Sequence, residues 1–211
     1  MSSLSLRLLK AFFSLFIGGA VIGLLHQYDT LVAAILILAT VLIVWTTYQR
    51  NVSNHRAIIL ISGCLLTGFL GMMGEILGIS NGHWLYHDLP DSRSFARWTP
   101  FAWMLSFVFL YRIEEFCINH FNFSSLKEKL LLVAVLSSVL PTWGEMVVIN
   151  FGAWSYTWDY QLLGVPLLAI VFLMIFHVSV YMGFTMVCRK YQINDLVFGC
   201  VSNAKTAHIS G

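Results

Sequence analysis

The chain has 211 residues, of which 58% are hydrophobic and 10% are charged, and its formal net charge is +2. A soluble domain carries roughly 25% charged residues, so this chain has too few of them to cover a surface that faces water. The composition therefore excludes a soluble globular domain and predicts a polytopic membrane protein built as one bundle. The small net charge gives no support to nucleic-acid binding.

Six apolar stretches follow one another, each close to the length that crosses a hydrocarbon core of roughly 30 Å. We therefore expect an all-α fold, a membrane bundle of six transmembrane helices in a single domain over residues 1–190. The polar residues 114–129 are expected to form a loop, and 191–211 a frayed cytoplasmic tail. The expected helices lie at 11–25, 30–48, 57–79, 100–113, 130–149 and 162–188.

One pattern occurs twice with identical spacing, at residues 74–86 and 144–156. Each copy reads Gly-Glu, six residues, Gly, one residue, Trp, one residue, Tyr. Each closes an apolar stretch, and a proline follows before the next one. Such an internal repeat indicates a repeated architecture, and we expect units at about 57–118 and 128–188. Because both glutamates close helices that run in the same direction, the repeat is predicted to be parallel, with its axis along the membrane normal.

The distribution of Lys and Arg predicts the orientation. All twelve of these residues except Arg93 and Arg97 lie near the N-terminus, in the loops at 49–56 and 112–129, or after the last helix. We therefore expect both termini to be cytoplasmic, as in a protein of the bacterial inner membrane. Both copies of the repeated aromatic loop then face the opposite side.

Glu75 and Glu145, the glutamates of the two copies, are the candidate catalytic residues. A carboxylate inside a membrane span is energetically expensive and is by default a candidate for function. A protonated carboxylic acid in an apolar cleft can donate a proton to an alkene or an ether oxygen. The alternative is structural, with each carboxylate accepting hydrogen bonds from its own loop and fixing that loop to the helix end.

Trp84, Tyr86, Trp154 and Tyr156 are candidate substrate-binding residues. Residues two apart in an extended segment share a face, so each Trp-x-Tyr pair could line a cleft for a flat apolar ligand. The alternative is an aromatic belt at the membrane surface. His177, inside the last span, is also a candidate for substrate binding and is expected to face the bundle, as a satisfied core histidine or as a proton relay.

We expect no metal and no cofactor. His83 and His87 have a spacing that could bind a metal, but the second copy of the pattern has Ala153 and Thr157 at the matching places. A site shared by both copies cannot use these histidines. The four cysteines show no CxxC spacing and are expected to be unpaired. Glu114 and its neighbour Glu115 are expected at a solvated helix end.

The segments Glu75-Ile-Leu-Gly-Ile-Ser-Asn-Gly-His-Trp-Leu-Tyr86 and Leu163-Gly-Val-Pro-Leu-Leu168 resemble the membrane-embedded carotenoid-biosynthesis superfamily. That superfamily contains carotenoid hydratases and heterodimer-type lycopene cyclases. The resemblance implies acid–base chemistry on a carotenoid or other isoprenoid, without a redox cofactor. The cyclases carry a Pro-x-Glu-Glu signature, whereas the corresponding stretches here, 100–103 and 166–169, contain no acid. The resemblance therefore implies hydration rather than cyclisation.

A second class of function remains open. A non-catalytic membrane protein that binds a hydrophobic ligand, transports a small solute or scaffolds a partner would have the same composition and the same repeat. The lipid bilayer is the expected environment in either case, and an isoprenoid is the expected ligand of the enzyme. The sequence does not indicate the oligomeric state.

Overall fold

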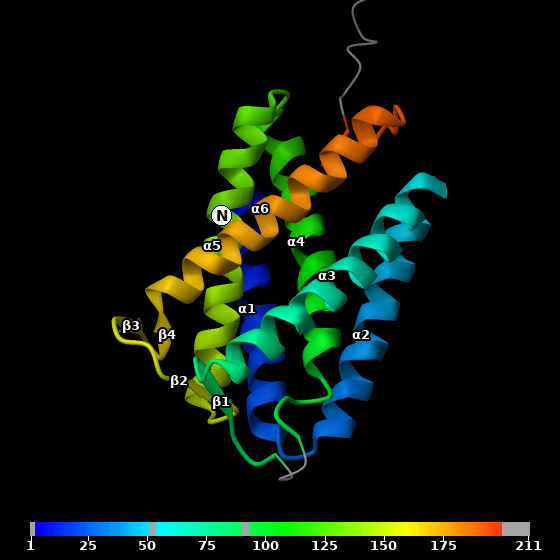
Figure 1. The fold of residues 1–211 in the computed structure, drawn as a ribbon. Helices are drawn as coiled ribbons and strands as arrows, with labels where there is room; N and C mark the ends of the chain where they lie inside the picture. The colour runs from blue at the N-terminus through cyan, green and yellow to red at the C-terminus, as the bar shows by residue number, and fades with distance from the viewer. Residues whose placement is uncertain (1–2, 51–53, 90–92, 200–211) are drawn as a thin grey trace, which may run out of the picture.

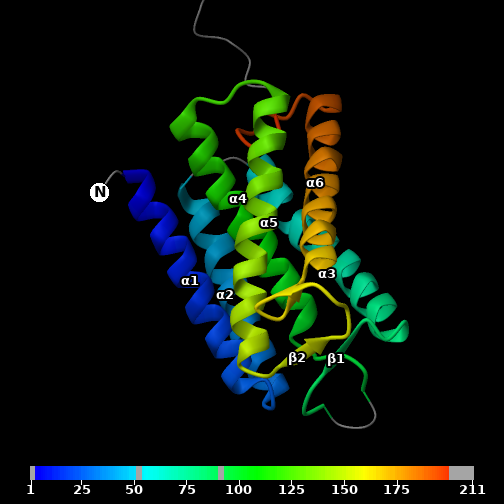
Figure 2. The same cartoon turned by 90° about the vertical axis from the view of Figure 1, so that its left-hand side faces the viewer.

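In the computed structural model, which describes residues 3–50, 54–89 and 93–199, the chain forms six α-helices and four short strands. The helices alternate in direction, so the N-terminal end of the first helix and the C-terminal end of the last helix lie at the same end of the bundle (Figures 1 and 2). The helices are α1 (Ser3–Leu25), α2 (Asp29–Arg50), α3 (Asn54–Ser80), α4 (Thr99–Phe121), α5 (Leu126–Asn150) and α6 (Leu167–Lys190). The strands are β1 (Trp84–Tyr86), β2 (Trp154–Tyr156), β3 (Gln161–Leu162) and β4 (Val165–Pro166).

Five of these helices, all except α4, are long and apolar enough to cross a membrane. Large apolar side chains are exposed on their outer surfaces, among them Phe13, Leu38, Phe69 and Leu131. A soluble monomer rarely exposes a contiguous surface of this kind, whereas a bilayer would cover it. The fold is therefore all-α, as predicted, and it fits a multi-pass membrane protein.

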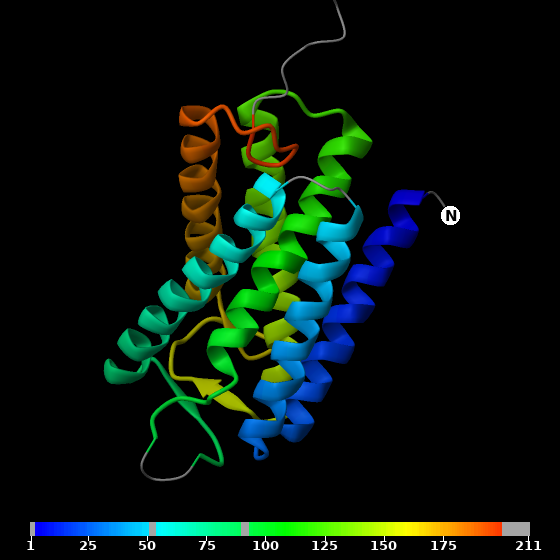
Figure 3. The same cartoon turned by 90° about the vertical axis from the view of Figure 1, so that its right-hand side faces the viewer.

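The helix α4 differs most from its predicted extent. The sequence predicts a helix at 100–113 followed by a polar loop, but the helix continues to Phe121. Every stretch of α4 long enough to span a membrane contains Arg112, Glu114 and Glu115. In the three ribbon views α4 lies between the other helices (Figures 1, 2 and 3), and it contacts α1, α2, α3 and α5.

Two acidic residues of α4 have partners on other helices. The carboxylate of Glu114 is fully buried, and its Oε1 atom lies 2.6 Å from Nε2 of His177 on α6. The carboxylate of Glu115 accepts two hydrogen bonds from the guanidinium of Arg56 on α3, at 2.5 and 2.7 Å. The expectation of a solvated helix end is therefore wrong, because Glu114 is fully buried and side chains from other helices pair with both carboxyl groups.

The link between α4 and α5 is short. Ser125 forms a capping box at the start of α5: its hydroxyl accepts a hydrogen bond from the backbone N–H of Glu128, at 3.3 Å, and the Glu128 carboxylate accepts one from the backbone N–H of Ser125, at 3.0 Å. This reciprocal pair satisfies two N–H groups that an uncapped helix leaves without partners. The predicted loop at 114–129 is therefore reduced to the few residues between Phe121 and Leu126.

The chain after α6 folds back onto the bundle, so the predicted frayed tail is wrong for residues 191–199. Asp195 accepts hydrogen bonds at 2.9 Å from the backbone N–H groups of the second and third residues after it, and Lys129 donates one to the carbonyl of Leu196 at 2.7 Å. Residues 200–211 of the predicted tail lie outside the described residues. The buried ring of Phe198 contacts four aromatic rings of α4 and α6, those of Phe107, Tyr111, Tyr181 and Phe184.

Candidate functional site

Both copies of the repeated pattern end their helices in the same way. The helices α3 and α5 each finish before a glycine in the left-handed region, Gly82 with φ 70° and Gly152 with φ 89°. The N–H groups of each glycine and of the next residue donate to carbonyls in the last helical turn, which is the Schellman arrangement. Because glycine lacks Cβ, it adopts this conformation without steric cost. The chain then leaves each helix end by the same path.

The aromatic segments that follow these turns pair with each other. The strands β1 and β2 are antiparallel, with Trp84 opposite Tyr156 and Tyr86 opposite Trp154. The middle residue of each strand is exposed while the Trp and Tyr on either side of it are not, so the Trp and Tyr of each copy share a face, as the alternation predicts. The facing rings are in contact, with centroids 5.6 Å apart for the first pair and 5.7 Å for the second.

The carboxylate of Glu75 accepts three side-chain hydrogen bonds. Trp84 Nε1 and Tyr86 Oη donate to its Oε2 atom, each at 3.0 Å, and Trp103 Nε1 of α4 donates to its Oε1 atom at 3.2 Å. Both oxygens are therefore engaged, and the first aromatic loop is fixed to the end of α3. This geometry matches the structural alternative for Glu75, in which the carboxylate accepts hydrogen bonds from its own loop and fixes that loop to the helix end.

Two glycines of α3 give the indole rings their space. A Cβ atom on Gly78 would overlap the ring of Trp84, and a Cβ atom on Gly71 would overlap the ring of Trp103. These glycines lie about one helical turn on either side of Glu75, on the same face of α3. The hydrogen bonds to Glu75 therefore depend on small residues at these two positions.

The carboxylate of Glu145, in the second copy, accepts one hydrogen bond only. Tyr156 Oη donates to its Oε2 atom at 3.2 Å, and across the described residues its Oε1 atom has no hydrogen-bond partner. Trp103 lies three residues after Pro100, and the residue three positions after Pro166 is Ala169. Glu145 therefore lacks a counterpart of the indole donor that α4 provides to Glu75. The two glutamates are alike in sequence but differ in how far their oxygens are satisfied.

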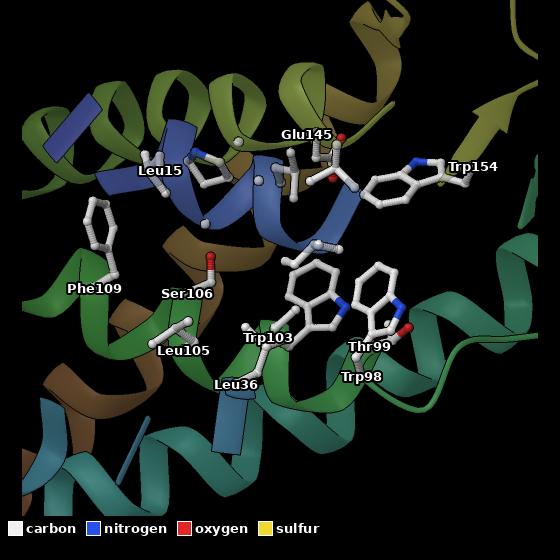
Figure 4. Close-up of a pocket in the computed structure, with 18 of the residues that line it drawn as sticks. Leu15, Leu36, Trp98, Thr99, Trp103, Leu105, Ser106, Phe109, Glu145 and Trp154 are labelled. Carbon is white, nitrogen blue, oxygen red and sulfur yellow. The ribbon is translucent and has the colours of Figure 1, made fainter. Parts of the chain in front are cut away.

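Two cavities adjoin the carboxylates. The α1–α5 cavity, of about 270 Å³, is lined mainly by α1, α2, α4 and α5. In Figure 4, side chains of α4 face Glu145 across it. The α3–α6 cavity, of about 360 Å³, is lined mainly by α3 and α6. The residues that line both cavities, and so lie between them, are Glu75, Trp84, Trp103, Glu145, Tyr156 and Leu173.

The structure brings all but one of the predicted site residues to one place. Glu75, Trp84, Tyr86, Glu145, Trp154 and Tyr156 all line the α1–α5 cavity. His177 is buried, as expected, but its partner is Glu114, and it belongs to neither cavity wall. Sequence reasoning missed Trp103, whose indole lines both cavities. Its one sequence signal is its position three residues after Pro100, near the start of the helix that follows the first copy.

The tyrosines of the two strands lie outside the helices and act as donors to the carboxylates. Burial, and then the nearby Glu75 carboxylate, raise the pKa of Tyr86 well above its usual value. Burial, and then the nearby Glu145 carboxylate, do the same to the pKa of Tyr156. Both effects disfavour the phenolate. The two hydroxyl groups therefore stay protonated at physiological pH and keep donating hydrogen bonds.

The histidine of the first loop has an aromatic partner. Trp158 Nε1 donates to His83 Nδ1 at 3.0 Å, and the two ring centroids are 4.8 Å apart. Within residues 3–50, 54–89 and 93–199, no group of three or more His, Cys, Asp and Glu residues is arranged to hold a metal ion. The three cysteines of these ranges, Cys64, Cys117 and Cys188, are buried free thiols.

No protein-family model, no curated protein and no solved structure matches this chain. The resemblance to the carotenoid-biosynthesis superfamily thus remains a prediction from residues 75–86 and 163–168.

Proposed function

We propose that the protein is an integral membrane enzyme that adds water to a carbon–carbon double bond of a carotenoid or other isoprenoid lipid, by acid–base chemistry without a cofactor. The observation that carries the proposal is the unpartnered Oε1 atom of Glu145 on a residue that lines two mainly apolar cavities. A carboxyl group in that position can transfer a proton to an apolar substrate, because none of the residues that the structure describes forms a hydrogen bond with the oxygen that carries it.

In this proposal Glu145 is the proton donor. Its carboxyl group transfers a proton to one carbon of the double bond, and the neighbouring carbon becomes a cation. Water attacks that cation and returns a proton to the Glu145 carboxylate. The net reaction adds one water molecule to the double bond and regenerates the acid. Tyr156 holds Oε2 of the same carboxyl group, which leaves Oε1 free for the transfer, and the rings of Trp84 and Trp154 on the cavity wall supply faces that can stabilise a cation.

Glu75 has a positioning role in the same scheme. Its three donors occupy both of its oxygens, so it has no free atom with which to reach a substrate. It fixes Trp84 and Trp103, which form part of both cavity walls. In this proposal Glu145 transfers the proton, and Glu75 holds the side chains that shape the cavities.

The proposal includes six membrane crossings and a parallel repeat of α3–α4 and α5–α6. With α4 as the sixth crossing, both termini lie on one side, and the excess of Lys and Arg on that side favours the cytoplasm. The pairing of β1 with β2 supports the repeat, because each Trp lies opposite the Tyr of the other copy. The site then lies towards the extracytoplasmic surface.

A non-catalytic role is the second candidate, and the surroundings of Glu75 favour it. Three donors on one carboxylate, with two rings seated on glycines, are what a structural clamp requires. A membrane protein that only binds a hydrophobic ligand would need this clamp and the cavities, but no proton donor.

The test is expression in a bacterial host that accumulates an acyclic carotenoid, with pigments analysed by chromatography and mass spectrometry. We expect a product heavier than the substrate by one water, and a yield lowered by about 10²–10⁴-fold in Glu145→Gln, the range that positioned acid–base catalysis contributes. Glu128→Gln is the matched control on the same helix, because glutamine also completes a capping box. Unchanged product in Glu145→Gln, or no hydrated product from the parent, would reject the enzyme and favour the binding protein.

A further inference from the structure

We propose that one elongated apolar ligand occupies both cavities at once and passes the carboxylates that lie between them. The reacting bond of this ligand would then lie beside Glu145, with one arm of the molecule in each cavity. The inference deepens the proposed function, on which it rests for the apolar nature of the ligand. It adds the shape of the ligand and its route into the protein.

The two cavities lie on opposite sides of the molecule. The α1–α5 cavity reaches to Gly18 on α1 and Leu36 on α2, and the α3–α6 cavity reaches to Gly74 on α3 and Phe172 on α6. In Figures 2 and 3, α1 and α2 lie on one side of α4 and α5, and α3 and α6 lie on the other. A ligand that fills both cavities therefore crosses the bundle from side to side.

The residues between the cavities are where such a ligand would meet polar groups. Glu145 lines both cavities, and its Oε1 atom has no hydrogen-bond partner among the described residues. Taken singly, cavities of about 270 and 360 Å³ are near the lower end of the range of about 300–1,000 Å³ that ligand pockets span. Taken together they have the volume of an ordinary ligand pocket with its acid in the middle.

The α3–α6 cavity opens towards the lipid-facing surface. Two of its lining residues, Leu77 and Phe172, are 60% and 55% exposed, and both belong to helices apolar enough to span the membrane. Gly74 on the same wall is exposed too, and a Cβ atom there would meet open space. A chain dissolved in the bilayer can therefore reach Glu145 between α3 and α6 without crossing water.

Each copy of the repeated pattern contributes a small residue to a different cavity. The glycine before each glutamate lines one cavity only: Gly74 lines the α3–α6 cavity and Gly144 lines the α1–α5 cavity. Each copy of the pattern thus supplies a carboxylate and, beside it, a residue without a side chain. In this proposal the two cavities are two halves of one binding site, each with one of these glycines in its wall and with both glutamates between them.

The experiment fills one cavity at a time. Gly18→Leu places a side chain in the α1–α5 cavity and Gly74→Leu places one in the α3–α6 cavity, while Gly183→Leu adds the same bulk to the exposed face of α6 outside both cavities. At all three glycines a Cβ atom meets nothing within 4 Å, so the three variants are matched. The probe is parinaric acid, a linear conjugated polyene, and its binding to protein in lipid nanodiscs is followed by energy transfer from tryptophan.

We expect Gly18→Leu and Gly74→Leu each to weaken probe binding by at least about tenfold, the loss that follows from expelling about two methylene groups. The control Gly183→Leu should stay within about twofold of the parent, as surface substitutions do. Gly18→Ala and Gly74→Ala, whose single added atom fits the open space, test whether a loss follows the filled volume and not a damaged fold. Geranylgeraniol should displace the probe, and the compact hydrocarbon adamantane should not.

An effect of only one of the two leucine variants would place the ligand in a single cavity and overturn the inference, as would an effect of neither. Failure of the proposed function looks different. Normal probe binding with both leucine effects, but no hydrated product from the parent, would retain the elongated ligand and reject the enzyme.

Discussion

Replacing each glutamate of the repeat by glutamine should affect the stability of the two copies differently. The carboxylate of Glu75 accepts from Trp103 at Oε1 and from Trp84 and Tyr86 at Oε2. An amide has one oxygen, which accepts hydrogen bonds, and one NH₂ group, which only donates them. In Glu75→Gln the NH₂ group must therefore replace one of the two carboxylate oxygens and point at a side chain that is itself a donor. At least one indole or hydroxyl group then loses its acceptor.

The size of the effect follows from this count. A donor left unsatisfied in a buried place costs about 1–3 kcal/mol, so Glu75→Gln should lower the free energy of unfolding by about that amount. In Glu145→Gln the amide oxygen can take over the single bond from Tyr156, and the NH₂ group takes the place of the unpartnered Oε1 atom. The hydrogen bond from Tyr156 thus keeps an oxygen acceptor, and the loss there should be about 1 kcal/mol or less.

The assay is unfolding in mixed micelles with a rising fraction of denaturing detergent, followed by far-ultraviolet circular dichroism. A double-mutant cycle with Trp103→Phe identifies the cause, since removing the opposed indole should recover part of the loss in the Glu75→Gln background. Equal losses in Glu75→Gln and Glu145→Gln, or strictly additive effects in the cycle, would refute the reasoning from hydrogen bonds.

Three more predictions follow from single features. Gly152→Ala should cost about 1–2 kcal/mol of unfolding free energy, because its φ of 89° places a Cβ atom against the backbone; a neutral result would mean that the turn relaxes. His177→Ala should lower the free energy of unfolding by about 1–3 kcal/mol, because it leaves the buried Oε1 atom of Glu114 without its hydrogen-bond partner, and Glu114→Gln in the same chain should restore part of the loss. An impermeant maleimide applied to intact cells should label Ser155→Cys but not Ser125→Cys in a cysteine-free background; the reverse would invert the orientation.

The site could be predicted from the sequence to the extent that the repeat carries it. Because the pattern has the same spacing twice, it indicated that Glu75 and Glu145 occupy related places, and both line the same two cavities. The spacing could not predict that β1 and β2 pair with each other, since an extended segment does not identify its partner strand. Nor could it predict the hydrogen bond from Trp103, which depends on how α4 packs against α3.

The fold could be predicted from hydropathy except where charges are paired inside the bundle. Glu114 and Glu115 suggested the end of a helix, because isolated charges are expensive in an apolar environment. Their partners, His177 and Arg56, lie on other helices, and nothing local in the sequence shows this pairing. The labelling positions Ser53 and Ser92, also suited to a topology test, lie outside the described residues.

The segment after α6 has a consequence for how the protein is made. Val197 is 0% and Phe198 2% exposed, yet both follow α6 in the chain and are therefore synthesised after the last helix. Until then the pocket that receives Phe198 stays open at the end of the bundle. A chain that stopped at Lys190 would hold all six helices and still present that unfilled aromatic pocket to the proteases that survey newly inserted membrane proteins. Insertion of the last helix alone therefore does not close the fold, because the segment after it must also pack against the bundle.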